Sequence, residues 1–236
     1  MEPNLKTNIE NIECDIYEKG NNSPVFIYIS SHGIPIGGKE ITQNLETLAP
    51  NLTYTLVEVF IDNWDLNLSP WVAPTAANKG NFTGNGRETL TWLTSKLVPY
   101  LNEKYPKQSS TYLIGYSLGG LFALWSLYES AVFDGIACCS GSLWFPLWDE
   151  YVKTATIKNK SLVYLSLGGK EETTKNPTMA SVGIRTREQL RLLKNTPNVI
   201  SATLEMNPGG HFSDTANRIA KAICWLIKEK DYVTNR

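Results

Sequence analysis

Short apolar runs rich in β-branched residues recur along the 236-residue chain, and segments with helical periodicity lie between them. The runs predict strands at residues 25–30, 53–61, 111–115, 135–140, 161–167 and 199–206. The segments between them predict helices at residues 38–48, 87–104, 118–129, 184–193 and 214–230. Apolar strands that alternate with helices are typical of a mostly parallel sheet with helices on both faces. We therefore predict one α/β domain over residues 1–236, with the more polar segment 9–18 as an edge strand.

The charge balance and the cysteine pattern argue against several classes of partner. The 22 Lys and Arg residues and the 23 Asp and Glu residues give a net charge of −1, whereas nucleic-acid-binding surfaces are usually basic. No apolar run approaches the roughly 18 residues that a membrane-spanning helix needs. The first residues include no apolar secretory segment, and the four cysteines lack zinc-ligand spacing. We expect a cytoplasmic protein with no nucleic-acid or membrane partner and no metal site, and the sequence does not indicate an oligomeric state.

The sequence Gly115-Tyr-Ser117-Leu-Gly119 lies between a predicted strand and a predicted helix. In that context a Gly-x-Ser-x-Gly motif forms a sharp turn that exposes the serine hydroxyl. The two glycines remove Cβ atoms that would collide where the strand meets the helix. We interpret Ser117 as a nucleophile; the alternative is a tight turn whose serine has no chemical role.

A serine hydroxyl needs a general base to become a nucleophile, and the chain contains two histidines. His32 follows the first central strand and His211 follows the last, so both are predicted at the carboxyl edge of the sheet. Hydrolases built on this turn carry their residues in the order serine, acid, histidine. Because only His211 follows Ser117, we predict that His211 is the base; the alternative is a surface-loop histidine.

The acid that orients the histidine is expected after the strand ending near residue 167. A carboxylate there would fix the tautomer of His211 and stabilise its protonated form. Glu171, in the segment Gly-Gly-Lys-Glu-Glu, is the preferred candidate. Glu172 and Asp214 remain alternatives, although Asp214 is also suited to capping the final helix.

Two backbone N–H groups are candidate donors to the oxyanion of the reaction. Leu118 begins the helix after Ser117, where its N–H can point at a developing negative charge. The His-Gly-Ile segment after the first central strand occupies the position that supplies the second donor in such hydrolases, and we assign that donor to Ile34. The alternative for this segment is that His32 only satisfies backbone groups of its loop.

Several segments resemble the putative-esterase family of α/β-hydrolases, which includes esterase D-type enzymes, feruloyl esterases, siderophore esterases and mycolyltransferases. The most specific is Gly-Tyr-Ser-Leu-Gly-Gly-Leu-Phe-Ala-Leu at residues 115–124, and Ser-Gly-Ser-Leu-Trp at residues 140–144 supports it. The resemblance extends over about residues 23–228. It implies the α/β-hydrolase fold and hydrolysis of a carboxylic ester by the predicted triad, without a metal or an organic cofactor.

Aromatic residues near the predicted nucleophile are candidates for the wall of a substrate pocket. Trp144 follows a central strand, and Trp71 lies in the longest irregular stretch, residues 62–86. Together with His32 they are the predicted substrate-binding residues for a small-molecule aryl or acyl ester. Because tryptophan also fills protein cores, packing is the alternative. A stretch as long as 62–86 is usually functional or mobile.

Two other functions on the same fold remain open at the level of sequence. An acyltransferase would pass the acyl group to an alcohol instead of water, and the residues do not distinguish the acceptor. A non-catalytic binding protein would keep the fold without a working triad. A histidine beyond hydrogen-bond reach of the serine would favour that second alternative.

Overall fold

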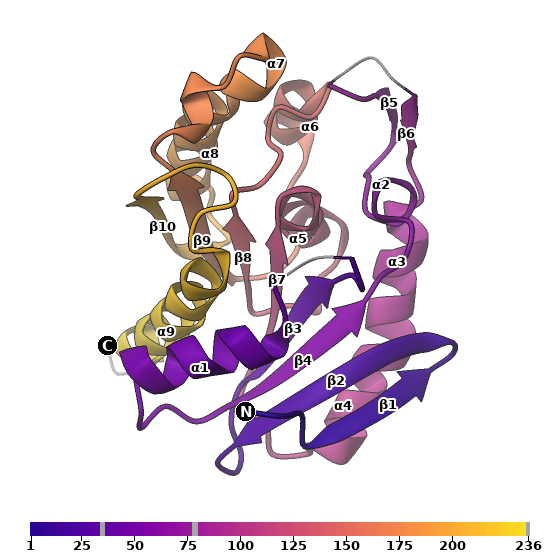
Figure 1. Ribbon diagram of the computed structural model, residues 1–236, viewed down its shortest axis with the longest axis vertical. Helices are drawn as coiled ribbons and strands as arrows, with labels where there is room; N and C mark the ends of the chain where they lie inside the picture. Colours follow the sequence, from indigo (N-terminus) through magenta and orange to yellow (C-terminus); the bar gives the residue numbers. More distant parts are fainter. Residues whose placement is uncertain (34–35, 77–79, 235–236) are drawn as a thin grey trace.

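The computed structural model describes residues 1–33, 36–76 and 80–234, and its centre is an eight-stranded sheet (Figure 1). The strand order is β1-β2-β4-β3-β7-β8-β9-β10. Pairing is antiparallel from β1 through β2 to β4 and parallel from β4 to β10. The strands are β1 (Leu5–Ile9), β2 (Ile12–Lys19), β3 (Val25–Ser30), β4 (Tyr54–Phe60), β7 (Thr111–Tyr116), β8 (Gly135–Cys139), β9 (Ser161–Gly168) and β10 (Val199–Asn207). This mostly parallel sheet confirms the predicted α/β fold.

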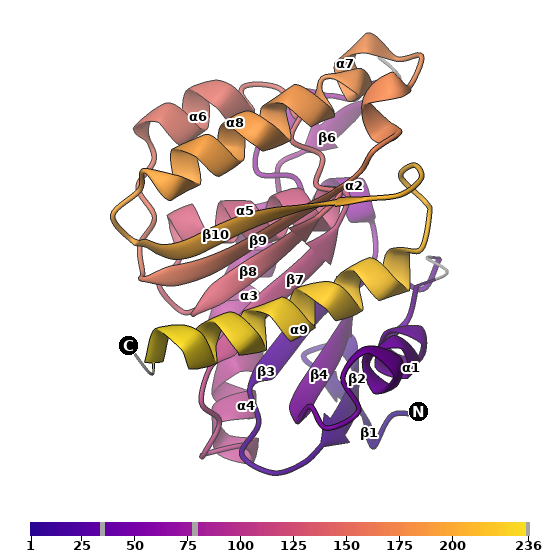
Figure 2. The ribbon, with the colours of Figure 1, turned by 90° about the vertical axis from the view of Figure 1, so that its left-hand side faces the viewer.

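Helices cover both faces of the sheet, and each face has its own apolar core (Figure 2). One face carries α1 (Gly38–Leu48) and α9 (Thr215–Thr234). The other carries α3 (Gly86–Trp92), α4 (Val98–Lys104), α5 (Leu118–Glu129), α6 (Trp148–Thr154) and α8 (Val182–Lys194). Successive residues of β3, such as Phe26 and Ile27, enter opposite cores because side chains alternate along a strand. Central strands buried in this way are apolar throughout, which made them recognisable in the sequence.

The strand predicted at residues 9–18 is confirmed from residue 12 onward as β2, but its predicted place at the edge of the sheet is wrong, because β2 is one arm of a hairpin. β1 and β2 pair through a turn at Glu10 and Asn11, both of which have positive φ angles (49° and 69°). Two consecutive residues with positive φ match the right-handed twist of the paired strands. The edge of the sheet is therefore β1, and β2 pairs on both sides.

The helix predicted over residues 87–104 is continuous in space but changes its winding. A π-helical turn, Leu93–Leu97, separates α3 from α4. Pro99 is the second residue of α4 and lies just after this turn. Proline has no N–H to donate, so the regular helical hydrogen-bond pattern is interrupted where the winding changes. The predicted apolar stripe is buried as expected, at Leu90, Leu93, Leu97 and Leu101.

Residues 62–86 contain more regular structure than the sequence indicated. A short helix, α2 (Trp64–Asn67), is followed by the paired strands β5 (Val72–Pro74) and β6 (Asn81–Thr83); residues 77–79 lie outside the described part. The helix α6, a 3₁₀ turn at Glu171–Thr173 and α7 (Pro177–Ala180) were also not predicted. Elements this short have too few residues to show a period.

Among the helices that the structure describes, none is long and apolar enough to cross a lipid bilayer.

Candidate active site

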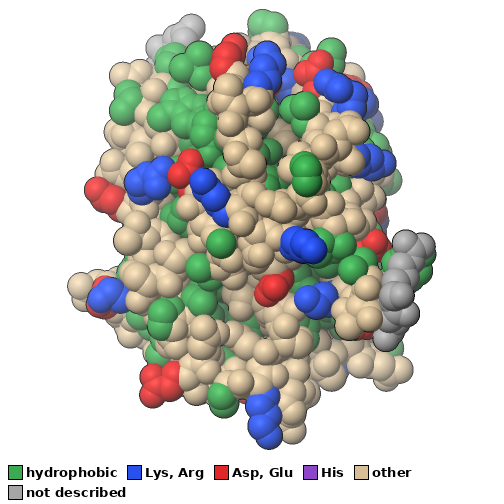
Figure 3. All heavy atoms as spheres, turned by 180° about the vertical axis from the view of Figure 1, so that it is seen from behind, with side chains coloured by type: hydrophobic (Ala, Val, Ile, Leu, Met, Phe, Trp, Pro, Cys, Tyr) green, Lys and Arg blue, Asp and Glu red, His purple; other side chains and the backbone are tan. Residues whose placement is uncertain are grey.

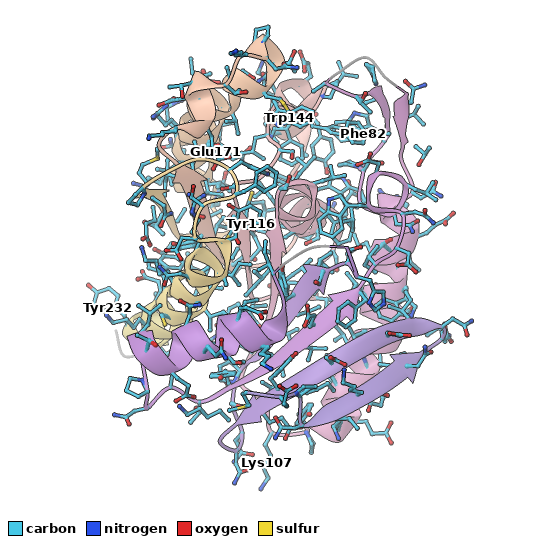
Figure 4. The ribbon with its side chains drawn as sticks, viewed as in Figure 1. Phe82, Lys107, Tyr116, Trp144, Glu171 and Tyr232 are labelled. Carbon is cyan, nitrogen blue, oxygen red and sulfur yellow. The ribbon has the colours of Figure 1, made fainter. Side chains whose placement is uncertain are left out.

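Four neighbouring parallel strands end at one edge of the sheet, and polar residues of the candidate site follow each of them. Ser117 follows β7, and Ser140 follows β8. Glu171 lies in the loop after β9, and His211 lies in the loop after β10. Because parallel strands point the same way, their following loops meet at this edge. Tyr116 and Glu171, labelled in Figure 4, mark two of these strand ends.

The turn that carries Ser117 has a strained backbone. Ser117 has φ 57° and ψ −122°, and its N–H donates to the carbonyl of Cys139 at 3.0 Å. A Cβ on Gly115 would lie 1.9 Å from the carbonyl oxygen of Gly119. Strain of this kind persists only where the surrounding structure enforces it. The close approach of β7 and α5 therefore requires glycine at position 115 and presents the serine side chain above the sheet.

We predict that Gly115→Ala destabilises the protein by about 3 kcal/mol, because the added methyl group meets backbone that cannot move independently. Urea unfolding followed by circular dichroism measures the change. Gly169→Ala is the matched control, since its nearest neighbour would be the Asn207 carbonyl at an ordinary 3.6 Å. Equal stability of the two variants would contradict the prediction.

Ser117, His211 and Glu171 form a continuous chain of hydrogen bonds. Ser117 Oγ lies 3.1 Å from His211 Nε2, and His211 Nδ1 lies 2.7 Å from Glu171 Oε2. With Nδ1 carrying a proton that it donates to the carboxylate, Nε2 is free to accept the serine proton. The separation of histidine from serine that a non-catalytic protein would show is not found.

The environment of Glu171 favours its ionised form. Burial by itself raises the pKa of this carboxyl. Hydrogen bonds from His211 Nδ1, Ser140 Oγ and the Gly168 N–H, each 2.7 Å long, outweigh burial and hold its pKa below the ordinary value. Glu171 is therefore a carboxylate at neutral pH and an acceptor for the imidazole proton.

The two alternative acids face other partners. Glu172 accepts two hydrogen bonds from Arg187, at 2.7 and 3.0 Å. The Asp214 carboxylate accepts from the side chain of Asn217 at 2.6 Å. Of the three candidates, only Glu171 is paired with the histidine.

Arg218 of α9 is a buried charge beside the site that the sequence analysis missed. Its Nη1 lies 3.3 Å from Glu171 Oε1 and donates to Ser140 Oγ at 3.0 Å. Nη1 also donates to the hydroxyl of Tyr116 at 3.0 Å, and that hydroxyl donates to the carbonyl oxygen of His211 at 2.6 Å. One signal could have revealed it: an arginine within the otherwise apolar face of an amphipathic helix.

Of the two predicted oxyanion donors, the structure describes Leu118 and not Ile34. Leu118 is the first residue of α5, so its N–H has no acceptor within the helix. It also directly follows Ser117 and is buried. Ile34 lies outside the described residues.

Two cavities share Ser117, His211 and Phe212 as wall residues. The larger, about 420 Å³, includes Trp144 in its wall. The smaller, about 330 Å³, is lined mainly by apolar side chains, among them Trp64. Phe212 borders both cavities and is 88% exposed. A ligand that fills either cavity therefore reaches the serine.

The structure does not bring the other two predicted pocket residues to these cavities. Trp71 packs against Phe145 and Tyr151, and its Nε1 donates to the carbonyl of Pro146 at 3.0 Å. Aromatic packing, the alternative for Trp71, decides its position. His32 stacks on Phe60, and its Nε2 lies 3.3 Å from Glu13 near the hairpin.

Within the described residues, no group of three or more His, Cys, Asp and Glu side chains is arranged to hold a metal ion.

The fold is that of the α/β-hydrolases. Over residues 12–211 the chain matches the model of the Esterase family, described as "putative esterase". It therefore belongs to this family and is a carboxylic ester hydrolase, with serine esterase activity in general terms. No curated protein matches the chain.

Solved structures with the same fold are distant in sequence. A siderophore hydrolase, EstA from Aspergillus nidulans, is 16% identical with a TM-score of 0.74, covering 94% of this chain and 92% of its own. An IroE-like serine hydrolase from Shewanella oneidensis is 15% identical with a TM-score of 0.75, covering 93% and 78%. Est1E from Butyrivibrio proteoclasticus is 14% identical with a TM-score of 0.59, covering 98% and 100%. These likenesses support the fold.

Proposed function

We propose that the protein hydrolyses a small-molecule carboxylic ester through an acyl-enzyme, with Ser117, His211 and Glu171 as the catalytic triad. The observation that carries the proposal is the unbroken hydrogen-bond chain from the serine hydroxyl through the imidazole to a buried carboxylate. Each member has the position that its role needs: a half-buried hydroxyl that borders both cavities, a histidine within reach, and an ionised acid behind it.

In the first half of the reaction, Ser117 Oγ attacks the ester carbonyl carbon and its proton passes to His211 Nε2. The carbonyl oxygen becomes an oxyanion, to which the Leu118 N–H donates together with the expected second donor, the Ile34 N–H. Collapse of this intermediate breaks the ester bond, and the departing alkoxide takes the proton from Nε2. Glu171 keeps the imidazole oriented and stabilises its positive charge.

In the second half, water takes the place of the alcohol. His211 Nε2 accepts a proton from the water as its oxygen attacks the acyl carbon, and the proton then returns to Ser117 Oγ as the acid leaves. No other reactant is needed for the two half-reactions to balance.

The substrate is proposed to place its two arms in the two cavities beside Ser117. Trp144 supports an aromatic or acyl group in the larger cavity, and the apolar wall around Trp64 supports an uncharged group in the smaller one. Siderophore hydrolases are among the similar structures, which makes siderophore esters a useful part of a substrate panel beside aryl and alkyl esters.

We also propose a cytoplasmic location and no nucleic-acid or membrane partner. The four cysteines are free, which suits a reducing compartment. On the face seen in Figure 3, basic and acidic side chains are interspersed and form no basic stripe.

A fluorophosphonate probe tests the proposal. The probe is expected to modify Ser117, located by peptide mapping, and His211→Ala is expected to slow labelling by about 10²-fold or more, because the general base is lost. Product analysis with added alcohol then separates hydrolysis from acyl transfer, since a transferase would form a new ester. Labelling of another serine, or an unchanged rate in the His211 variant, would refute the proposed triad.

A further inference from the structure

The guanidinium of Arg218 lies directly behind the triad and is fully buried, with 0% of its surface exposed. A buried charge is costly unless an opposite charge and hydrogen bonds compensate for it. Here Glu171 supplies the opposite charge, at 3.3 Å. Arg218 Nε nevertheless has no partner among the described residues. Contacts with the described residues therefore leave one nitrogen of this buried guanidinium without compensation.

One terminal nitrogen, Nη1, contacts the ends of three strands. It donates to the Tyr116 hydroxyl at the end of β7 and to Ser140 Oγ after β8, both at 3.0 Å. It also faces Glu171 Oε1 after β9. Since Ser140 Oγ in turn donates to the same Glu171 oxygen at 2.7 Å, the carboxylate is fixed from two directions.

The other terminal nitrogen, Nη2, holds the loop that carries the histidine. It donates to the carbonyl oxygens of Pro208 at 3.0 Å and Gly210 at 2.9 Å. Gly210 directly precedes His211, whose own carbonyl accepts from the Tyr116 hydroxyl. The histidine loop is thus attached to the guanidinium both directly and through the residue next to Ser117.

The backbone leaves room for this side chain. A Cβ on Gly168 would lie 2.8 Å from Arg218 Nη2 and 2.9 Å from Glu171 Oε1. Glycine at the end of β9 therefore lets the acid and the guanidinium approach the strand together. A planar fork with two terminal nitrogens is also required, because a lysine ammonium cannot reach both sets of acceptors at once.

The geometry points to Arg218 as a positioning residue of the esterase. Its buried guanidinium fixes the Glu171 carboxylate and the His211 loop relative to the turn that carries Ser117. It touches no substrate and acts through these groups. The inference rests on the proposed function. A misplacement of about 1 Å between reacting groups can lower a rate by roughly 10²-fold, so the expected effect is large.

Arg218→Lys is the first test, because it keeps the charge and removes the fork. We expect kcat for a soluble aryl ester to fall about 10- to 100-fold with KM changed less than about threefold, since the substrate is not contacted.

Tyr116→Phe is the second variant. It removes the hydroxyl through which Arg218 Nη1 is linked to the His211 carbonyl, while the guanidinium keeps Glu171 as its opposite charge. A fall in kcat of about fivefold is expected. If Arg218→Lys does not fold, Tyr116→Phe decides the outcome.

A double-mutant cycle separates positioning from general structural support. Arg218→Lys should lose nearly all its effect on kcat in a His211→Ala background, because there is no longer an imidazole to position. Arg187→Ala is the matched control: this arginine pairs with Glu172, beside the acid, at the protein surface. Its kcat is expected to stay within about twofold of the wild type.

Four results would overturn the inference. Three concern folded Arg218→Lys: an unchanged kcat, a raised KM with kcat preserved, or an undiminished effect in the His211→Ala background. The fourth, for the case in which Arg218→Lys does not fold, is an unchanged kcat in Tyr116→Phe. Fluorophosphonate labelling of the wild type is measured in parallel. Failure of Ser117 to react there would refute the proposed function itself, whereas normal labelling with an unchanged Arg218 variant would refute only the role of the arginine.

Discussion

Replacement of Ser117 by alanine is expected to lower kcat for an activated ester such as p-nitrophenyl acetate by roughly 10⁴- to 10⁶-fold. Without Oγ no acyl-enzyme can form, and the histidine has no hydroxyl from which to accept a proton. The fold should persist, because the strain at φ 57° is a property of the turn and not of the hydroxyl. Initial rates at saturating substrate measure the loss, and a cooperative urea transition shows that the variant is folded.

Ser95→Ala is the matched control for that experiment. This serine is exposed on the π-helical turn, where its Oγ donates to the carbonyl of Thr91 at 2.7 Å. Its removal is expected to leave kcat unchanged. Activity of Ser117→Ala at the level of Ser95→Ala would show that the chain hydrolyses esters without this nucleophile.

Replacement of Glu171 by glutamine is expected to lower kcat by about 10³-fold with a small change in KM. An amide cannot supply the negative charge that stabilises the protonated imidazole, and its NH₂ group can hold His211 in the wrong tautomer. Glu172→Gln is the control, since it makes the same change one residue away in a carboxylate that pairs with Arg187. Equal losses in the two variants would contradict the assignment of the acid.

The stability of Glu171→Gln relative to the wild type is expected to depend on pH. The pKa of Glu171 is lowered in the folded protein, so its ionisation stabilises the fold above its ordinary value of 4.5. That contribution is lost as the pH falls through the lower, folded-state pKa. The stability difference between wild type and Glu171→Gln should therefore be present at pH 7 and shrink in acid, as measured by urea unfolding across pH. A difference that grows in acid would show that the pKa of Glu171 is raised instead.

The sequence predictions were most accurate where a short, continuous run of residues carries the structural pattern. The central strands were found almost residue by residue, because burial on two faces leaves an uninterrupted apolar run. The hairpin of β1 and β2 was merged into one edge strand, since its exposed residues carry a weak pattern. Trp71 was expected in the pocket and packs in an aromatic cluster instead. In the sequence, a tryptophan that lines a pocket looks the same as one that packs in a core. Only its neighbours in the folded protein distinguish the two positions.

Sequence alone determined where the central strands lie, the sharp turn at Ser117 and the choice of His211 as the base, because each is indicated by a short run of residues or by the order of residues along the chain. Only the tertiary structure decided which carboxylate faces His211. Glu171 and Glu172 are adjacent in one 3₁₀ turn, yet one turns inward to the imidazole and the other outward to Arg187. The tertiary structure also decided the contacts of Arg218, which join residues at or after the ends of four strands. Such contacts depend on how helices and strands pack, and no local pattern of residues encodes them.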